Sequence, residues 1–218
     1  MTEANFKAIA EQLRKPHGSA GKEVGAMMNK GNELMNMAAI EQLEIKSNDI
    51  VLEIGMGNGY FVRNILAKDQ TIKYIGCDYS EEMVAEAFNY NNDFVKKGQA
   101  RFNRANVLKL PYTNEYFTKV FTVNTIYFWD KTEIVLSEIK RVLKKNGELI
   151  ISLRPRSIMD KLPVTSYGFT TFSKDDCIEL LTNHGFEVVN VLEKEDVDIE
   201  LFGEKFKNAF VIVKAFKR

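Results

Sequence analysis

Three glycines directly follow an apolar run near residue 50, in the segment VLEIGMGNGY. Residues 50–54 are nearly all apolar, which indicates a buried strand, and Gly55, Gly57 and Gly59 follow at alternate positions. Glycines at such a turn let the backbone approach a ligand closely, and the free amides of a following helix can bind its polar groups. The segment therefore predicts a ligand-binding turn between a strand and a helix.

The residues on either side of this turn indicate the kind of ligand. The dinucleotide-binding fingerprint places a third glycine where this chain has Tyr60. Glu53 would repel a pyrophosphate, whereas its carboxylate suits a ligand that carries an ammonium and a sulfonium. The alternative is that Glu53 only binds backbone amides, because an unpaired buried charge is costly. Together these features favour a sulfonium ligand over a nicotinamide cofactor.

A second acidic residue lies at the end of the next predicted strand. Asp78 follows Gly59 by nineteen residues, where a carboxylate can accept hydrogen bonds from the two ribose hydroxyls of a nucleoside. The same placement serves NAD, so Asp78 indicates a nucleoside without selecting the cofactor. Asp78 could instead cap the following helix, although Ser80 is available for that role.

Apolar runs alternate with segments of helical period from residue 49 onward, which is typical of βαβ units and a mostly parallel sheet. We expect strands at 50–54, 71–77, 100–104, 119–123, 148–153, 187–192 and 208–216, and helices at 60–67, 80–98, 132–145 and 173–185. The predicted fold class is α/β, a Rossmann-like three-layer sandwich with a seven-stranded, mostly parallel sheet whose last strand is antiparallel.

The first 48 residues differ from the rest of the chain. They predict three helical stretches, split by Pro16-His17-Gly18 and by Asn29-Lys30-Gly31-Asn32. We expect one structural domain, in which 1–48 form an N-terminal helical cap or lid on a donor-binding part at 49–218. The cap contains Met27, Met28, Met35 and Met37. Flexible thioethers suit an apolar ligand, although apolar helix faces more often simply pack on a core.

Five segments in chain order resemble the motifs of class I S-adenosylmethionine-dependent methyltransferases. They are VLEIGMGNGY, YIGCDYS, ANVLKLPY, VFTVNTIYFW and RVLKKNGELI, and they lie within residues 49–153. The pattern is similar to that of the small-molecule group with a methyltransferase type 11 domain, which includes the ubiquinone and menaquinone C-methyltransferases. The resemblance implies S-adenosyl-L-methionine as the methyl donor and S-adenosyl-L-homocysteine as the product.

The resemblance also implies roles for individual residues. Gly55 and Gly57 would line the methionine moiety, Asp78 would hold the ribose, and Tyr79 would pack beside the adenine. Asn106 stands where the family usually has an aspartate; its amide oxygen can still accept a bond from the adenine amine, and the alternative is a local turn. Val107 would offer its backbone amide to the ring. The expected donor site is completed by Glu53, Gly59, Ser80, Met83 and Asn124.

The acceptor side is less defined. Tyr127 and Trp129 could face the sulfonium or a flat substrate, or could equally pack a helix. We expect Tyr127 to orient the substrate and Arg154 to attract an anionic group of it. No general base is identified, and the segment after the fourth strand lacks the clustered carboxylates of a metal site. The predicted substrate is a small, apolar or aromatic molecule.

Composition restricts the other functions. Thirty basic residues balance thirty acidic ones, which argues against a nucleic-acid partner. Two cysteines without metal-ligand spacing, no apolar leader and no membrane-spanning run predict a cytoplasmic protein without membrane insertion. The sequence does not indicate an oligomeric state. Two alternatives stay open: a noncatalytic S-adenosylmethionine-binding module and, with less support, a nicotinamide-dependent oxidoreductase.

Overall fold

The computed structural model describes residues 2–201 and 204–218. The helices are α1 (Glu3–Arg14), α2 (Gly18–Gly31), α3 (Glu33–Gln42), α4 (Val62–Leu66), α5 (Glu81–Tyr90), α6 (Asn92–Lys96), α7 (Thr132–Val142), α8 (Arg156–Met159) and α9 (Lys174–Asn183), with 3-10 turns η1 (Ile126–Phe128) and η2 (Pro163–Ser166). The strands are β1 (Ile50–Ile54), β2 (Lys73–Asp78), β3 (Ala100–Arg104), β4 (Phe117–Val123), β5 (Leu143–Leu153), β6 (Phe186–Leu201) and β7 (Glu204–Lys217).

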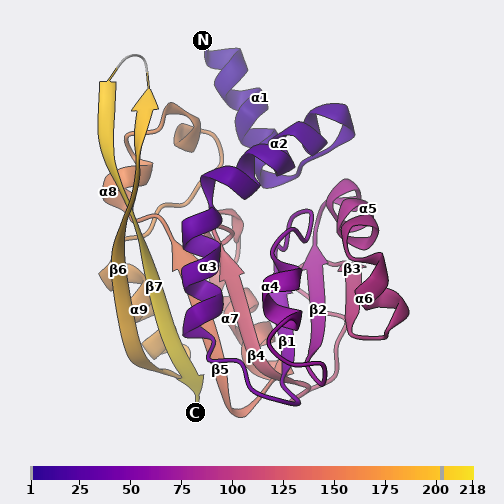
Figure 1. Cartoon of the computed structure of the whole chain (residues 1–218). Coiled ribbons are helices and arrows are strands. Elements are labelled where there is room, and N and C mark those ends of the chain that lie inside the picture. The colour runs from indigo at the N-terminus through magenta and orange to yellow at the C-terminus, as the bar shows by residue number, and fades with distance from the viewer. Residues whose placement is uncertain (1, 202–203) are drawn as a thin grey trace.

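All of these strands belong to one sheet, in the order β3-β2-β1-β4-β5-β7-β6 (Figure 1). Neighbours from β3 to β5 are parallel, whereas β7 is antiparallel to both β5 and β6. The predicted α/β fold with an antiparallel last strand is therefore confirmed. Chain order reverses between β1 and β4, and in open α/β sheets ligands bind at the carboxyl ends of the strands beside such a reversal.

Each face of the sheet carries its own apolar core. One face packs β1, β2 and β4 against α3 and α4, through residues that include Met35, Ile65 and Phe121. The other face packs β4 and β5 against α7 and α9, with Leu136 and Leu181 among its buried members. Helices α3 and α4 lie in front of the sheet in Figure 1, while α1 and α2 lie beyond the carboxyl ends of the strands. The three layers hold the strand ends rigidly beneath α1 and α2.

Most predicted elements are present, but some boundaries are wrong. The helix expected at 132–145 ends at Val142, because Leu143 already pairs with Phe117 of β4. The segment 80–98 is divided into α5 and α6 at Asn91, whose side-chain amide donates to the backbone oxygen of Gly59 at 2.9 Å. Helix α8 and turn η2 were not predicted. Both are shorter than the windows in which a helical period can be recognised.

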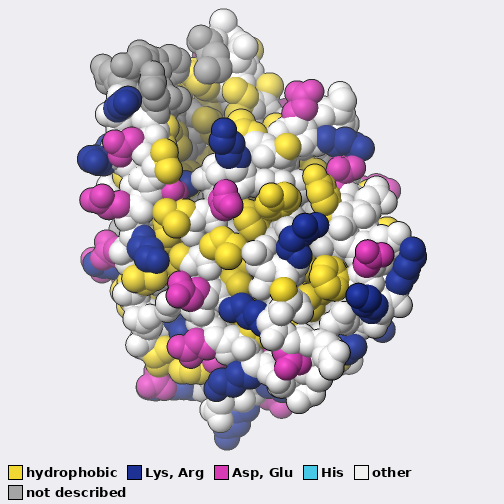
Figure 2. Space-filling view, in the orientation of Figure 1, with side chains coloured by type: hydrophobic (Ala, Val, Ile, Leu, Met, Phe, Trp, Pro, Cys, Tyr) yellow, Lys and Arg dark blue, Asp and Glu magenta, His cyan; other side chains and the backbone are white. Residues whose placement is uncertain are grey.

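Strands β6 and β7 extend well beyond their predicted ranges of 187–192 and 208–216. They form an antiparallel hairpin whose pairing continues from Phe186–Lys217 to Leu201–Glu204. The outer part of β6 is rich in charged residues and carries the highly exposed Val197, so it has no apolar pattern typical of a strand. Figure 2 shows basic and acidic side chains intermixed on the face that it displays.

A buried charge cluster lies at the end of the sheet opposite α1 and α2. Glu148 at β5 pairs with Lys119 of β4 at 2.8 Å and with Lys214 of β7 at 3.3 Å. Both lysine side chains are less than a tenth exposed, at 4% and 8%. Lys119 also lies 3.8 Å from Asp49, and Lys214 lies 3.1 Å from the more exposed Glu44. Glu148 is therefore the one carboxylate of the cluster that both lysines share, and it joins three neighbouring strands.

We predict that Glu148→Gln lowers the free energy of unfolding by about 3 kcal/mol, because it leaves the enclosed ammonium of Lys119 with only the more distant Asp49 and that of Lys214 with only the exposed Glu44. Urea unfolding followed by circular dichroism measures this. Glu187→Gln is the matched control, since the Glu187–Arg218 pair is exposed and its loss should cost less than about 1 kcal/mol. Equal unfolding midpoints for the two variants would contradict the prediction.

Candidate functional site

A cavity of about 290 Å³ opens at the carboxyl ends of β1, β2 and β4. Its walls come from the turns after these strands, from the segment after β3, and from α1 and α2. Nine of the predicted site residues line it: Glu53, Gly55, Gly57, Asp78, Tyr79, Met83, Asn106, Val107 and Asn124. The structure thus brings together side chains that are spread over more than seventy residues of sequence.

The turn after β1 has the backbone that its glycines predict. Gly55 and Gly57 have φ of 71° and 57°, in the left-handed region that favours glycine. A Cβ at Gly55 would collide with the side chain of Thr125, whereas one at Gly57 would meet open space. Gly55 therefore lets the turn after β4 pack closely, and Gly57 leaves its backbone accessible from the cavity.

Asp78 fixes this turn from the end of β2. Its Oδ2 accepts the backbone N–H of Gly57 at 3.0 Å, and its Oδ1 accepts that of Ser80 at 2.8 Å. Burial raises the pKa of Asp78 to about 6, although backbone N–H groups of Ser80, Gly57 and Tyr79 oppose the rise. Each carboxylate oxygen retains a second lone pair that can accept a bond from a ligand.

Glu53 is the other enclosed acid of the cavity. Its Oε2 accepts a hydrogen bond from the hydroxyl of Tyr74 on β2 at 2.5 Å, and only 5% of the residue is exposed. Burial raises the pKa of Glu53 to about 8; the Tyr74 hydroxyl opposes this rise and the Asp78 charge adds to it. A carboxyl group in this state gains most from a cationic ligand, which would stabilise its ionised form.

The adenine side of the expected site has mixed contacts. The Oδ1 of Asn106 accepts the backbone N–H of Leu108 at 3.0 Å, which is the local turn considered as the alternative for this residue. One lone pair of that oxygen and the amide group stay available to a ligand. Tyr79 is half exposed, and the Lys15 ammonium lies 4.9 Å from its ring centre. The exposed ring of Tyr79 can therefore pack on a flat group at the cavity.

Three of the predicted site residues lie outside the cavity lining. Gly59 packs against Ala87 and Asn91, and a Cβ there would lie 2.9 Å from the Ala87 side chain. Ser80 caps α5 by accepting the N–H of Met83 at 3.2 Å, and its hydroxyl donates to the backbone oxygen of Pro16. Tyr127 is buried behind the residues that line the cavity. Gly59 and Ser80 therefore support the lining residues without reaching the cavity.

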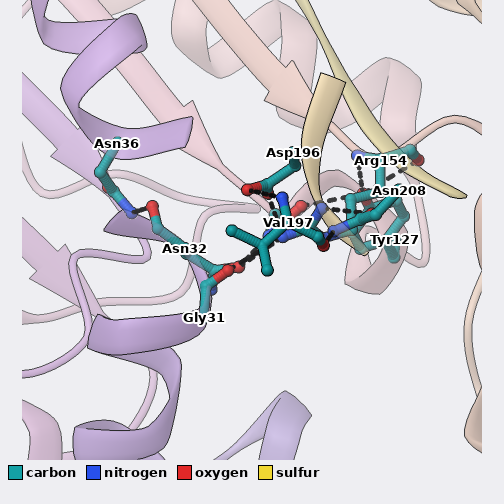
Figure 3. Close-up of polar contacts among 9 residues, drawn as sticks. Gly31, Asn32, Asn36, Tyr127, Arg154, Asp196, Val197 and Asn208 are labelled. Carbon is teal, nitrogen blue, oxygen red and sulfur yellow. Dashed lines mark hydrogen bonds and ion pairs between the residues drawn. The ribbon is translucent and has the colours of Figure 1, made fainter. Parts of the chain in front are cut away.

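Tyr127 and Arg154 belong to one hydrogen-bonded network (Figure 3). The Tyr127 hydroxyl donates to Oδ1 of Asn124 at 3.0 Å or to the backbone oxygen of Arg154 at 3.1 Å. The Arg154 guanidinium is paired with Asp196 at 2.9 Å and is 10% exposed. The expectation that Arg154 attracts an anionic substrate group is therefore wrong, because its charge is already neutralised. Tyr127 lies outside the lining, so it can act on a substrate only through lining residues such as Asn124, which it bonds, and Phe128, whose ring it meets edge-on.

Sequence reasoning predicted a cap at 1–48 but, apart from the methionines, not which of its residues line the cavity. These residues are Leu13, Arg14, Pro16, Gly25, Met28, Asn29, Asn32 and, from α3, Asn36. The polar turn at 29–32 was recognised only as a break between helices. No local pattern states which part of the sheet a preceding helix will cover, so this contact depended on the fold.

Residues 2–201 and 204–218 contain neither a metal-binding cluster nor a membrane-spanning helix. In that part of the chain no three His, Cys, Asp or Glu side chains gather in a way that could hold a metal ion. None of its helices has the length and apolar character needed to cross a membrane.

Comparison with known proteins identifies the family. Residues 52–151 match the model of the methyltransferase domain. The methyltransferase YdaC of Bacillus subtilis (strain 168) is 30% identical over 132 residues, which cover 61% of this chain and 71% of that protein. The residues that match the family model include the glycine turn and Asp78.

Solved structures show the same fold. A methyltransferase complex with the Haloferax volcanii Trm112 methyltransferase activator superposes with a TM-score of 0.74 at 17% identity, over 97% of this chain and 96% of that one. Geranyl diphosphate C-methyltransferase from Streptomyces coelicolor A3(2), in complex with Mg²⁺, geranyl diphosphate and S-adenosyl-L-homocysteine, gives a TM-score of 0.71 at 12% identity, over 93% and 85%. The chain belongs to the class I S-adenosylmethionine-dependent methyltransferases.

Proposed function

We propose that the cavity binds S-adenosyl-L-methionine and that the chain transfers the methyl group to a small molecule. The observation that carries this proposal is the Asp78 carboxylate, which holds the amide of Gly57 at the floor of the cavity while keeping lone pairs for a ribose. When bound, the donor supplies a methyl group activated by a positively charged sulfur. Membership in the methyltransferase family argues against the alternative function of a nicotinamide-dependent oxidoreductase.

The residues of the cavity fit this donor. Gly57 presents an open backbone to the amino-acid part, and Glu53 offers a carboxylate to its ammonium. Asp78 faces the nucleoside, and Asn106 and Val107 lie where the adenine would be held. The same residues would release S-adenosyl-L-homocysteine more readily, because it lacks the positive charge on sulfur.

The acceptor is proposed to be small and apolar or aromatic. Leu13, Met28, Phe128 and Trp129 line the cavity on the side of α1, α2 and η1. A cavity of about 290 Å³ suits a small ligand rather than a polymer. The Streptomyces protein of this fold binds geranyl diphosphate, a small molecule with an apolar chain and an anionic diphosphate.

The chain's own part in the reaction is to align the acceptor and exclude water. In-line displacement at a methyl group needs both reacting atoms held in one line, and a dry site keeps water from competing. We propose that 1–48 act as the cap that does this, with α1 and α2 over the cavity and α3 anchored on the sheet. Gly25 of α2 approaches Met83 of α5, which closes one side.

The cellular setting is part of the same proposal. Cys77 and Cys177 are free and buried, as in proteins of a reducing compartment such as the cytoplasm. The balanced net charge argues against a nucleic-acid partner.

We predict that Asp78→Asn weakens binding of S-adenosyl-L-homocysteine at least about tenfold, because a neutral amide accepts weaker hydrogen bonds than a carboxylate. Isothermal titration measures the affinity, and NADH serves as the ligand that should not bind. The matched control is Asp69→Asn, the same change in a loop before β2 at the other edge of the sheet. Unchanged affinity in Asp78→Asn would refute the proposed donor site. Donor binding without turnover on any substrate of a panel would favour a noncatalytic module.

A second prediction concerns pH. Without ligand the Glu53 pKa is about 8, so the carboxyl is mostly protonated near neutrality. A bound ammonium favours the ionised form, so binding releases a proton and affinity rises with pH. Between about pH 6.5 and about pH 8.5 the wild-type dissociation constant for S-adenosyl-L-homocysteine should fall about tenfold. In the control Glu53→Gln the ligand titrates as before, but residue 53 has no carboxyl. The affinity of this variant should therefore change less than about twofold over the same pH range. Parallel pH profiles would show that Glu53 does not contact the ammonium.

A further inference from the structure

Arg154 lies behind the cavity and joins three parts of the chain (Figure 3). Its Nη1 donates to Oδ1 of Asn208 on β7 at 2.6 Å, and its Nη2 donates to Oδ2 of Asp196 on β6 at 2.9 Å. The same Nη2 donates to the backbone oxygen of Gly31, the last residue of α2, at 3.0 Å. Only 10% of the Arg154 side chain and 6% of the Asp196 side chain are exposed. An enclosed ion pair thus ties the C-terminal hairpin to the end of α2.

The network continues into two asparagines that line the cavity. Oδ1 of Asn32 accepts from Nδ2 of Asn124 at 3.0 Å and from Nη2 of Arg154 at 3.5 Å. On the other side, the Tyr127 hydroxyl bonds Oδ1 of Asn124 and accepts the backbone N–H of Arg154. Asn124 also has a φ of 56°, a conformation that few side chains adopt. The side chain and backbone of Arg154 therefore fix Asn32 and Asn124 from two directions.

Asn32 is the single residue between α2 and α3. Helix α3 is packed on the sheet, with Met35 fully buried, whereas α2 covers the cavity. The direction of α2 is thus set at this junction, where the guanidinium also complements the negative end of the α2 dipole. Moving Gly31 or Asn32 would shift every α2 residue that faces the cavity.

We infer that Arg154 is a positioning residue for the methyl-donor site. It holds the α2–α3 junction and Asn124 in one arrangement and so couples the C-terminal hairpin to the fit of α2 over the donor. The ligand named in the test rests on the proposed function, whereas the placement of α2 does not. Arg154 acts without touching the donor, since it lies outside the cavity lining.

Arg154→Lys tests the inference, because one ammonium keeps the charge beside Asp196 but cannot also reach Asn208 and Gly31 in the planar geometry of a guanidinium. We expect its dissociation constant for S-adenosyl-L-homocysteine to rise about tenfold, as for loss of a charge-assisted contact. Amide hydrogen exchange should accelerate in 18–31 but not in 81–90. The emission of Trp129, the one tryptophan of the chain and part of the cavity wall, should shift.

Arg156→Lys is the matched control. Arg156 is two residues away, half exposed, and paired with Asp176 outside the cavity. This variant should keep wild-type affinity, exchange and emission at temperatures below its unfolding transition, so it separates positioning from a general loss of stability.

Tyr127→Phe gives a second test that retains the ion pair. It removes only the hydroxyl between Asn124 and Arg154, and should weaken binding about threefold with unchanged exchange in 18–31. Wild-type affinity in both Arg154→Lys and Tyr127→Phe, with wild-type exchange in 18–31, would overturn the inference. If the wild-type protein itself does not bind S-adenosyl-L-homocysteine, the proposed function fails, and exchange and Trp129 emission still decide whether Arg154 positions α2.

Discussion

The hydrogen bond from the Gly57 amide to the Asp78 carboxylate determines the shape of the cavity. It closes the glycine turn against the end of β2, which is already in register with β1 from Ile50–Lys73 to Ile54–Cys77. The second oxygen of the same carboxylate binds Ser80, which caps α5 and whose hydroxyl reaches the backbone of Pro16. One carboxylate therefore fixes the turn, the start of a helix and the joint between α1 and α2. The enclosure that permits this also raises its pKa.

Local patterns predicted those parts of the fold that have local causes. The strands at 50–54 and 100–104 have the predicted ends, since each lies between clear turn or helix signals. The prediction that one helix continues to residue 145 was wrong, because pairing of Leu143 with β4 outweighs the helical pattern of the following lysines. The outer part of the β6–β7 hairpin was not predicted for a related reason. Its strands satisfy each other's backbone hydrogen-bonding groups, so they need no apolar face.

The candidate site divides in the same way. Gly55, Gly57 and Asp78 were recognisable because backbone geometry and strand ends dictate both their residue types and their spacing. A cap at 1–48 was predicted, but most of the residues of α1 and α2 that line the cavity were not, because the lining depends on where a preceding segment lies across the sheet. Arg154 was interpreted as a free charge, since its partner Asp196 is forty-two residues away in a strand whose polar sequence gave no sign of it. A charge that is neutralised by a partner far away in the sequence therefore cannot be recognised from its local sequence.

The enclosed pair of Arg154 and Asp196 restricts how the protein can be recombined with its relatives. Acceptor preference in such a fold would ordinarily be exchanged by grafting another N-terminal segment onto a constant sheet. Here the graft junction at Asn32 is bonded to Arg154, the residue directly after β5, which is itself bonded to the C-terminal strands β6 and β7. A chimaera that exchanges one chain end alone would therefore disturb this network, and we expect divergence at one end to be accompanied by compensating changes at the other.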